Sequence, residues 1–174
     1  MESYKLVGMD LSFIDYPSPN TWSIIIYMSG CEHKCPGCQN FDLQKPNQGK
    51  VYTEHSLISA IKEFAKSNRT DNIVLSGGDP LYKTNLDTTN CILNNLGLDY
   101  NICIYTGYDI NYAKSLCING FKLIKCGTYD QTKKCTSGNF ETYIQLASTN
   151  QNFYDSNFNL LSKNGRLNYN EFKQ

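Results

Sequence analysis

The chain lacks an excess of charge of either sign, because its 174 residues contain 16 Lys and Arg against 16 Asp and Glu. A balanced chain has no overall field that would draw it to nucleic acid or to an anionic membrane surface. We therefore expect neither nucleic acid nor a membrane among its partners.

Long hydrophobic runs are also missing. No apolar stretch approaches the ~20 residues that span a bilayer, and the chain shows no signal peptide. Its eight cysteines are therefore expected to stay reduced, which favours a protein of the cytoplasm. No internal repeat or linker divides the chain, so we expect one domain, residues 1–174, with a core at about 5–155 and a tail at 156–174.

A second closely spaced cysteine pair is missing as well. Zinc knuckles usually combine two such pairs, and this chain has only the C-x2-C of Cys35 and Cys38. A disulfide framework is also disfavoured, because a chain of this length does not need covalent staples. A zinc site that adds His33 or a distant cysteine remains an alternative.

What the sequence does contain is a C-x3-C-x2-C motif at Cys31, Cys35 and Cys38. Three thiolates can ligate three irons of a [4Fe-4S] cluster and leave the fourth iron without a protein ligand. An iron without a protein ligand can bind another molecule, which indicates a cluster with a chemical role rather than a purely structural one. The motif directly follows the apolar segment 21–30, which is predicted to be a buried parallel strand and its loop. The cysteines are thus expected at the carboxyl end of a strand, where α/β proteins build their sites.

Strands and amphipathic helices alternate after the cysteine motif. The predicted elements are a helix from the N-cap Thr53 to about 67, a strand at 72–75, a helix at 85–96, a strand at 101–105, a helix at 109–117 and a strand at 121–125. This order predicts a parallel sheet with right-handed crossovers. A closed eight-fold barrel needs about 250 residues, so we expect an open, partial (β/α) barrel. In the tail, Asn164-Gly165 lies between two apolar runs and predicts a short C-terminal hairpin.

The segment Ser76 to Pro80 follows the second predicted strand and contains two glycines and Asp79. By itself it could be an ordinary glycine-rich turn with an N-cap aspartate. Its place one βα unit after the cysteine motif resembles the radical S-adenosylmethionine (SAM) superfamily. That resemblance implies that Cys31, Cys35 and Cys38 hold a [4Fe-4S] cluster and that SAM binds at the open iron. It also implies that SAM contacts Gly77, Gly78 and Asp79.

Within that superfamily the chain is similar to the activating enzymes of anaerobic ribonucleotide reductase. The similarity covers about residues 5–155 and is carried by segments 28–40, 76–80, 105–108 and 147–151. It implies an oxidoreductase that reductively cleaves SAM to a 5'-deoxyadenosyl radical, which removes a hydrogen from a glycine of the partner reductase. It further implies a one-electron donor such as flavodoxin or ferredoxin, and no catalytic residue beyond the cluster ligands.

Further contacts are expected at the ends of the later predicted strands and beyond them. Cys126 stands where many family members have an aspartate, and we expect the neighbouring Lys125 to pair with an anion such as the SAM carboxylate. Tyr105, with Tyr108, is expected near the adenine, and Asn40 is a further predicted cofactor contact. The segment 148–151 is expected to shape an open rim that seats the glycine loop.

Three other functions stay open. The chain could activate a different glycyl radical enzyme, or modify a small molecule such as a deazapurine precursor. The non-enzyme alternative is an interaction module stabilised by zinc. A second cluster at Cys126 and Cys135 is disfavoured, because two thiolates are too few.

Overall fold

The computed structural model describes residues 3–18, 21–135 and 143–168. At its centre lies a six-stranded sheet with the strand order β2-β3-β5-β6-β7-β9. The four inner strands run parallel: β3 (Ser23–Met28), β5 (Asn72–Gly77), β6 (Asn101–Tyr105) and β7 (Leu123–Cys126). The edge strands β2 (Gly8–Ser12) and β9 (Asn152–Asp155) are antiparallel to their neighbours. The predicted parallel order is therefore confirmed for the inner strands, and both edges differ from it.

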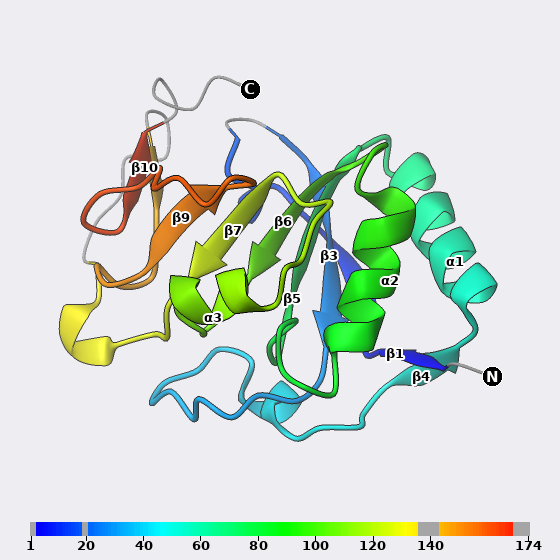
Figure 1. The fold of residues 1–174 in the computed structure, drawn as a ribbon, viewed down its shortest axis with the longest axis horizontal. Coiled ribbons are helices and arrows are strands. Elements are labelled where there is room, and N and C mark those ends of the chain that lie inside the picture. The colour runs from blue at the N-terminus through cyan, green and yellow to red at the C-terminus, as the bar shows by residue number, and fades with distance from the viewer. Residues whose placement is uncertain (1–2, 19–20, 136–142, 169–174) are drawn as a thin grey trace.

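Three helices lie on one side of this sheet (Figure 1): α1 (Glu54–Ser67), α2 (Leu86–Leu96) and α3 (Ile110–Ser115). The start of α1 confirms the predicted N-cap. Thr53 accepts from the backbone N–H of Ser56, and the Ser56 hydroxyl accepts from the backbone N–H of Thr53, which forms a capping box. Among the described residues, no helix is long and apolar enough to cross a membrane.

The inner strands are buried on both faces, which explains their unbroken apolar sequences. Alternate residues such as Ile24 and Ile73 pack against the helices. The residues between them, including Ile25 and Val74, enter a second core on the other face. That face is covered by Tyr16 and by a small antiparallel sheet of β8 (Tyr143–Gln145) and β10 (Arg166–Asn168).

The central sheet is not closed, since β2 and β9 are its two edges. A separate antiparallel pair, β1 (Tyr4–Leu6) with β4 (Lys50–Tyr52), lies beside α1 (Figure 1). The protein is thus a mixed α/β fold with a mostly parallel central sheet.

The predicted C-terminal hairpin is only partly present. Asn164 and Gly165 have φ values of 52° and 70°, and Lys163 and Arg166 exchange two backbone hydrogen bonds of 2.8 and 3.0 Å. This is the expected two-residue turn. The strand that follows, however, pairs with β8, because Leu167 is buried opposite Ile144 in the second core. The hairpin prediction is therefore right for the turn and wrong for the pairing of the strand after it.

Candidate functional site

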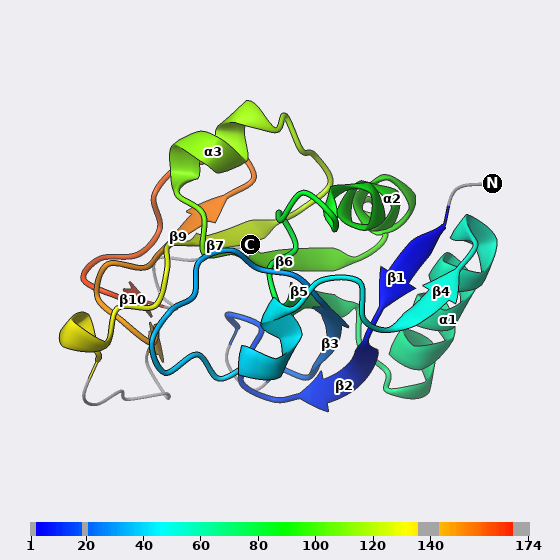
Figure 2. The same ribbon diagram turned by 90° about the horizontal axis from the view of Figure 1, so that it is seen from below.

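The cysteine motif lies in the loop between β3 and β4, beyond the carboxyl end of β3 (Figure 1). Viewed from below, this loop passes in front of the sheet (Figure 2). Cys31, Cys35 and Cys38 are all free thiols and all half-buried. The structure therefore brings the three predicted cluster ligands to the carboxyl end of a parallel strand, as expected.

Backbone hydrogen bonds close this loop at its base. A 3-10 helix, η1 (Phe41–Gln44), brings the chain back, so that Gly30 N–H donates to the Leu43 carbonyl at 2.7 Å and Cys31 N–H to the Gln44 carbonyl at 3.0 Å. Between them, Cys38 N–H donates to the Cys35 carbonyl at 3.2 Å, and Gly37 has a φ of 73° that favours glycine. The loop thus holds its cysteines through main-chain contacts of its own.

The two glycines after β5 allow the backbone of that loop to lie against the end of β3. A Cβ on Gly77 would stand 2.3 Å from the Met28 carbonyl oxygen, and one on Gly78 would stand 2.4 Å from the Gly30 carbonyl oxygen. Asp79 N–H donates to the same Gly30 carbonyl at 2.8 Å. The two glycines were expected to let the backbone lie close to a ligand. In the structure they let it lie close to the segment that leads into Cys31. Contact of Gly77 and Gly78 with SAM stays a prediction.

Asp79 is the buried centre of the site, with 1% of its surface exposed. One carboxylate oxygen, Oδ1, accepts from Leu81 N–H at 2.9 Å and from the Thr106 hydroxyl at 2.8 Å. The other, Oδ2, accepts from Gly107 N–H at 2.8 Å and lies 3.1 Å from His33 Nε2. A buried carboxylate is tolerated only when it is hydrogen-bonded in this way. It ties together the loops that follow β3, β5 and β6.

The contact between His33 and Asp79 was not predicted from the sequence. The His33 ring also packs edge-on against Tyr108, with ring centroids 4.4 Å apart, and Tyr108 donates its hydroxyl hydrogen bond to Glu32 Oε1 at 2.7 Å. Burial and the Glu32 carboxylate raise the pKa of Tyr108, so this phenol stays protonated. Tyr108 therefore holds the cysteine loop, and its predicted contact with adenine is untested. A single histidine within a cysteine motif carries no local signal that would identify such a partner.

Lys125 and Tyr105 are neighbours on β7 and β6, with the ammonium nitrogen 5.5 Å from the ring centroid. Burial lowers the pKa of Lys125, and the negative charge of Asp79 is the largest influence that opposes this shift. No carboxylate of the described residues lies within 4.0 Å of the Lys125 ammonium. The Tyr105 hydroxyl donates to the Asp15 carbonyl at 2.6 Å. Lys125 thus has no acid partner among the residues that the structure describes.

Asn40, the remaining predicted cofactor contact, precedes η1 and is half-buried, and its side chain makes no cap hydrogen bond to that helix. Its contact with SAM stays a prediction.

Within the segment 148–151, which was predicted to shape the rim, Thr149 is exposed and Asn150 is half-buried. Ser148 and Gln151 are buried, with 0% and 4% of their surfaces exposed. The Gln151 amide donates to the Gly127 carbonyl at 3.1 Å and accepts from Ser148 N–H at 3.2 Å. The rim prediction is wrong for both residues, because their polar groups are used by the backbone of the fold. Asn150 donates to the Thr128 carbonyl at 2.9 Å, and its buried Oδ1 has no hydrogen-bond partner in the described part of the chain.

Cys126 and Cys135 lie in different surroundings. Cys126 packs in the core between sheet and helices, where burial raises the pKa of its thiol to about 12. The half-buried Cys135 thiol lies 3.0 Å from the position that a Cβ on Gly165 would take. Both thiols are free, and the structure offers no support for a second cluster between them.

The three motif cysteines fit a cluster that needs three thiolate ligands. Burial is the main cause that raises the pKa of Cys31 to about 11; a backbone hydrogen bond from His33 opposes the shift, and the charges of Asp79, Cys35 and Cys38 add to it. None of them is bound in a disulfide. The donor set is therefore the one that iron-sulfur clusters use.

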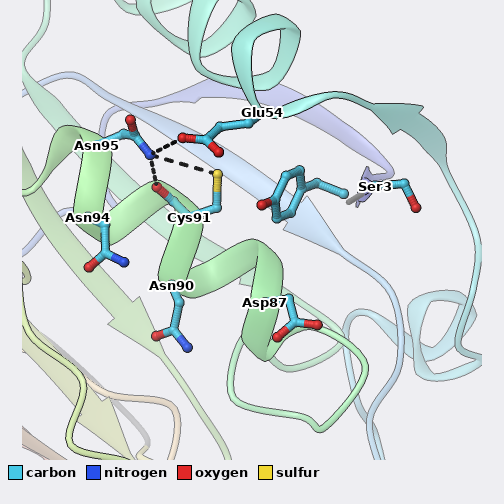
Figure 3. Close-up of a pocket in the computed structure, with 8 residues that line it drawn as sticks. Ser3, Glu54, Asp87, Asn90, Cys91, Asn94 and Asn95 are labelled. Atoms are coloured by element: carbon cyan, nitrogen blue, oxygen red, sulfur yellow. Dashed lines mark hydrogen bonds between the residues drawn. The ribbon is translucent and has the colours of Figure 1, made fainter. Parts of the chain in front are cut away.

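A separate polar pocket lies between β1, the start of α1 and α2 (Figure 3). Within it Asn95 donates to Glu54 Oε1 at 3.1 Å and to the Cys91 carbonyl at 2.9 Å. None of the predicted site residues lines this pocket, whose lining is formed by Ser3, Tyr4, Glu54, Asp87, Asn90, Cys91, Asn94 and Asn95.

Comparison with known proteins agrees with the cluster. A family model described as a 4Fe-4S single cluster domain matches residues 22–154. The anaerobic ribonucleoside-triphosphate reductase-activating protein of Salmonella typhi is 28% identical over 116 residues, which cover 63% of this chain and 75% of that protein. Its namesake in Enterobacteria phage T4 is 27% identical over 96 residues, 53% of this chain and 61% of that protein. A putative glycyl-radical enzyme activating enzyme of Methanocaldococcus jannaschii is 36% identical over 72 residues, 41% of this chain and 27% of that protein.

The match to the family model begins just before β3 and ends within β9, so it includes the cysteine loop and all four parallel strands. It therefore spans most of the chain together with Cys31, Cys35 and Cys38, and the chain belongs to the family of 4Fe-4S single cluster domains.

Proposed function

We propose that this chain is a radical SAM activase that generates the glycyl radical of an anaerobic ribonucleoside-triphosphate reductase. The observation that carries the proposal is the set of three free thiols on one loop at the carboxyl edge of a parallel sheet. The names of the relatives from Salmonella typhi and phage T4, which are activating proteins of that reductase, support the substrate.

The chain's own residues hold and shape this site. Cys31, Cys35 and Cys38 are the ligands of the [4Fe-4S] cluster, which with SAM supplies one-electron reductive chemistry when bound. The hydrogen bonds from Gly30 and Cys31 to the carbonyls of η1 close the base of the ligand loop. A three-ligand loop held in this way leaves one coordination position for SAM.

SAM is proposed to contact Gly77, Gly78, Asp79, Tyr105, Lys125 and Asn40. The Lys125 ammonium has no acid partner in the described structure and is placed to neutralise the SAM carboxylate. The two oxygens of Asp79 already contact four groups: Leu81 N–H of its own loop, the Thr106 hydroxyl and Gly107 N–H of the loop after β6, and the His33 ring. The SAM ammonium would therefore replace His33 at Oδ2.

The open sheet is proposed to be the partial (β/α) barrel of the radical SAM type, in a single domain of residues 1–174. A sheet that is not closed favours a protein loop as substrate, because a closed pocket suits a small molecule. The electron donor is proposed to be flavodoxin or ferredoxin, and the location the cytoplasm, where the thiols stay reduced. Nucleic acid and membrane are not among the proposed partners.

The proposal is tested by anaerobic reconstitution with iron and sulfide, followed by reduction in the presence of SAM. We expect a brown protein that releases 5'-deoxyadenosine, and an electron paramagnetic resonance signal of a glycyl radical after mixing with the reductase. If a radical forms only on another glycyl radical enzyme, the substrate is not the reductase but a different member of the class named for the Methanocaldococcus jannaschii relative. A colourless protein with stoichiometric zinc and no SAM cleavage would contradict the activase.

A further inference from the structure

Cys31, His33 and Asp79 form a compact group of metal-binding side chains. One ligand atom from each residue, a thiol sulfur, a ring nitrogen and a carboxylate oxygen, lies within 4.8 Å of the other two. The nitrogen and oxygen are already 3.1 Å apart. This group shares only Cys31 with the three-cysteine set, so it is a different donor set on the same loop.

Sulfur, nitrogen and oxygen donors together suit zinc, a cation of borderline softness that accepts Cys, His and carboxylate ligands. Three protein ligands with a water in the fourth position is a common arrangement for it. Irons of a [4Fe-4S] cluster, by contrast, are held mainly by thiolates. The trio therefore favours a single Zn²⁺ ion over a cluster.

Surrounding contacts hold two of the three ligands in position. Asp79 keeps the hydrogen bonds from Thr106 and Gly107 when a cation replaces its bond to His33. The His33 ring is held by Tyr108 and lies against Gly107, where an added Cβ would stand 2.4 Å from its Cδ2. Outer contacts of this kind orient metal ligands and raise affinity.

We propose that the cluster-free chain binds one Zn²⁺ through Cys31, His33 and Asp79, and that this ion prevents assembly of the iron-sulfur cluster. The two metal sites exclude each other because both require the Cys31 thiolate. The zinc site does not depend on the proposed activase function, since it is formed by residues of the cluster-free protein.

The test uses the metal-free chain of residues 1–174 under anaerobic conditions, titrated with zinc chloride by calorimetry and with Co²⁺ by absorption. His33→Gln removes the imidazole but leaves an amide that can still bond to Asp79. Its matched control is His55→Gln, because His55 is the chain's only other histidine and is exposed on α1. A double variant, Cys35→Ala with Cys38→Ala, removes the other cluster ligands while the trio remains.

We expect one zinc ion per chain in the wild type, in His55→Gln and in the double cysteine variant, and at least ~10-fold weaker binding in His33→Gln. Circular dichroism on each variant confirms that it is folded. Wild-type affinity in His33→Gln, or loss of zinc in the folded double variant, would overturn the proposal in favour of a site built from the three cysteines.

A second measurement tests the exclusion. Reconstitution of the wild type with one equivalent of zinc should lower its iron and sulfide content, and the same zinc should have little effect on His33→Gln. A wild-type protein that acquires a full cluster while it retains the zinc would show that the two sites do not share Cys31.

Discussion

The imidazole of His33 and the carboxylate of Asp79 are 46 positions apart in the chain and 3.1 Å apart in the structure. Asp79 also accepts hydrogen bonds from Thr106 and Gly107. One carboxylate thereby joins the loops after three neighbouring parallel strands. The position of the cysteine loop depends on this carboxylate as well as on its own backbone bonds.

Replacement of Cys31, Cys35 or Cys38 by Ala should abolish cluster binding, because each thiolate holds one iron. Loss of SAM cleavage should follow in every case. Iron and sulfide analysis with a 5'-deoxyadenosine assay measures both effects. Cys117→Ala is the matched control, since that thiol is exposed and outside the site. A single motif variant with a full cluster and wild-type SAM cleavage would refute the ligand assignment.

Asp79→Ala should destabilise the protein and weaken SAM binding. It leaves the buried donors of Leu81 and Thr106 and the partly buried N–H of Gly107 without this acceptor, at a cost of ~1–3 kcal/mol for each buried group. A lost charge-assisted hydrogen bond should lower SAM affinity by about tenfold or more in protein that still carries its cluster. Denaturant unfolding and calorimetry measure these quantities.

The control for Asp79→Ala is Asp87→Ala on the exposed face of α2. It should lower the free energy of unfolding by no more than ~1 kcal/mol, through the lost interaction of Asp87 with the first turn of α2, and leave SAM affinity unchanged. If Asp79→Ala unfolds at the same denaturant concentration as this control, the carboxylate does not tie the loops together.

Gly78→Ala should separate the loops after β3 and β5, because the new Cβ would stand 2.4 Å from a backbone oxygen of Gly30. Overpacking of this kind costs ~1–3 kcal/mol. Gly8→Ala is the control, since a Cβ there meets nothing within 4 Å. Thermal unfolding and cluster content measure the difference, and equal values for the two variants would contradict the packing role.

Lys125→Met should stabilise the cluster-free protein at neutral pH and weaken SAM binding by about tenfold. Burial lowers the pKa of Lys125 below its ordinary 10.5, so the unfolded chain binds more protons than the folded one between the lowered pKa and 10.5. The free energy of unfolding of the wild type should therefore rise with pH through that window, and that of Lys125→Met should lack this rise. Normal SAM affinity in Lys125→Met would exclude the carboxylate contact.

Gln151→Ala should lower the free energy of unfolding by ~1–3 kcal/mol, because it removes buried partners of the Gly127 carbonyl and the Ser148 N–H. Asn90→Ala, at an exposed position of α2, is the control and should have no effect. Urea denaturation compares them. A Gln151→Ala protein of wild-type stability that only fails to form the glycyl radical would restore the rim interpretation.

Local sequence patterns were sufficient for most of the core. The apolar runs that predicted strands at 72–75 and 101–105 correspond to β5 and β6, and Thr53 is the N-cap of α1 as its position indicated. The antiparallel edges β2 and β9 were missed, because a short edge strand carries a weak apolar signal and its direction depends on the strand it pairs with.

The sequence by itself determined the cluster motif, since the spacing of Cys31, Cys35 and Cys38 is written in eight consecutive residues, together with its place after a buried strand. Only the tertiary structure decided what surrounds that motif. Asp79 finds its partners at Thr106 and Gly107, 27 and 28 positions away, and Gln151 finds Gly127 at 24. Such contacts are set by how strands and loops pack against one another, and a buried polar group takes whichever donor or acceptor that packing brings within reach.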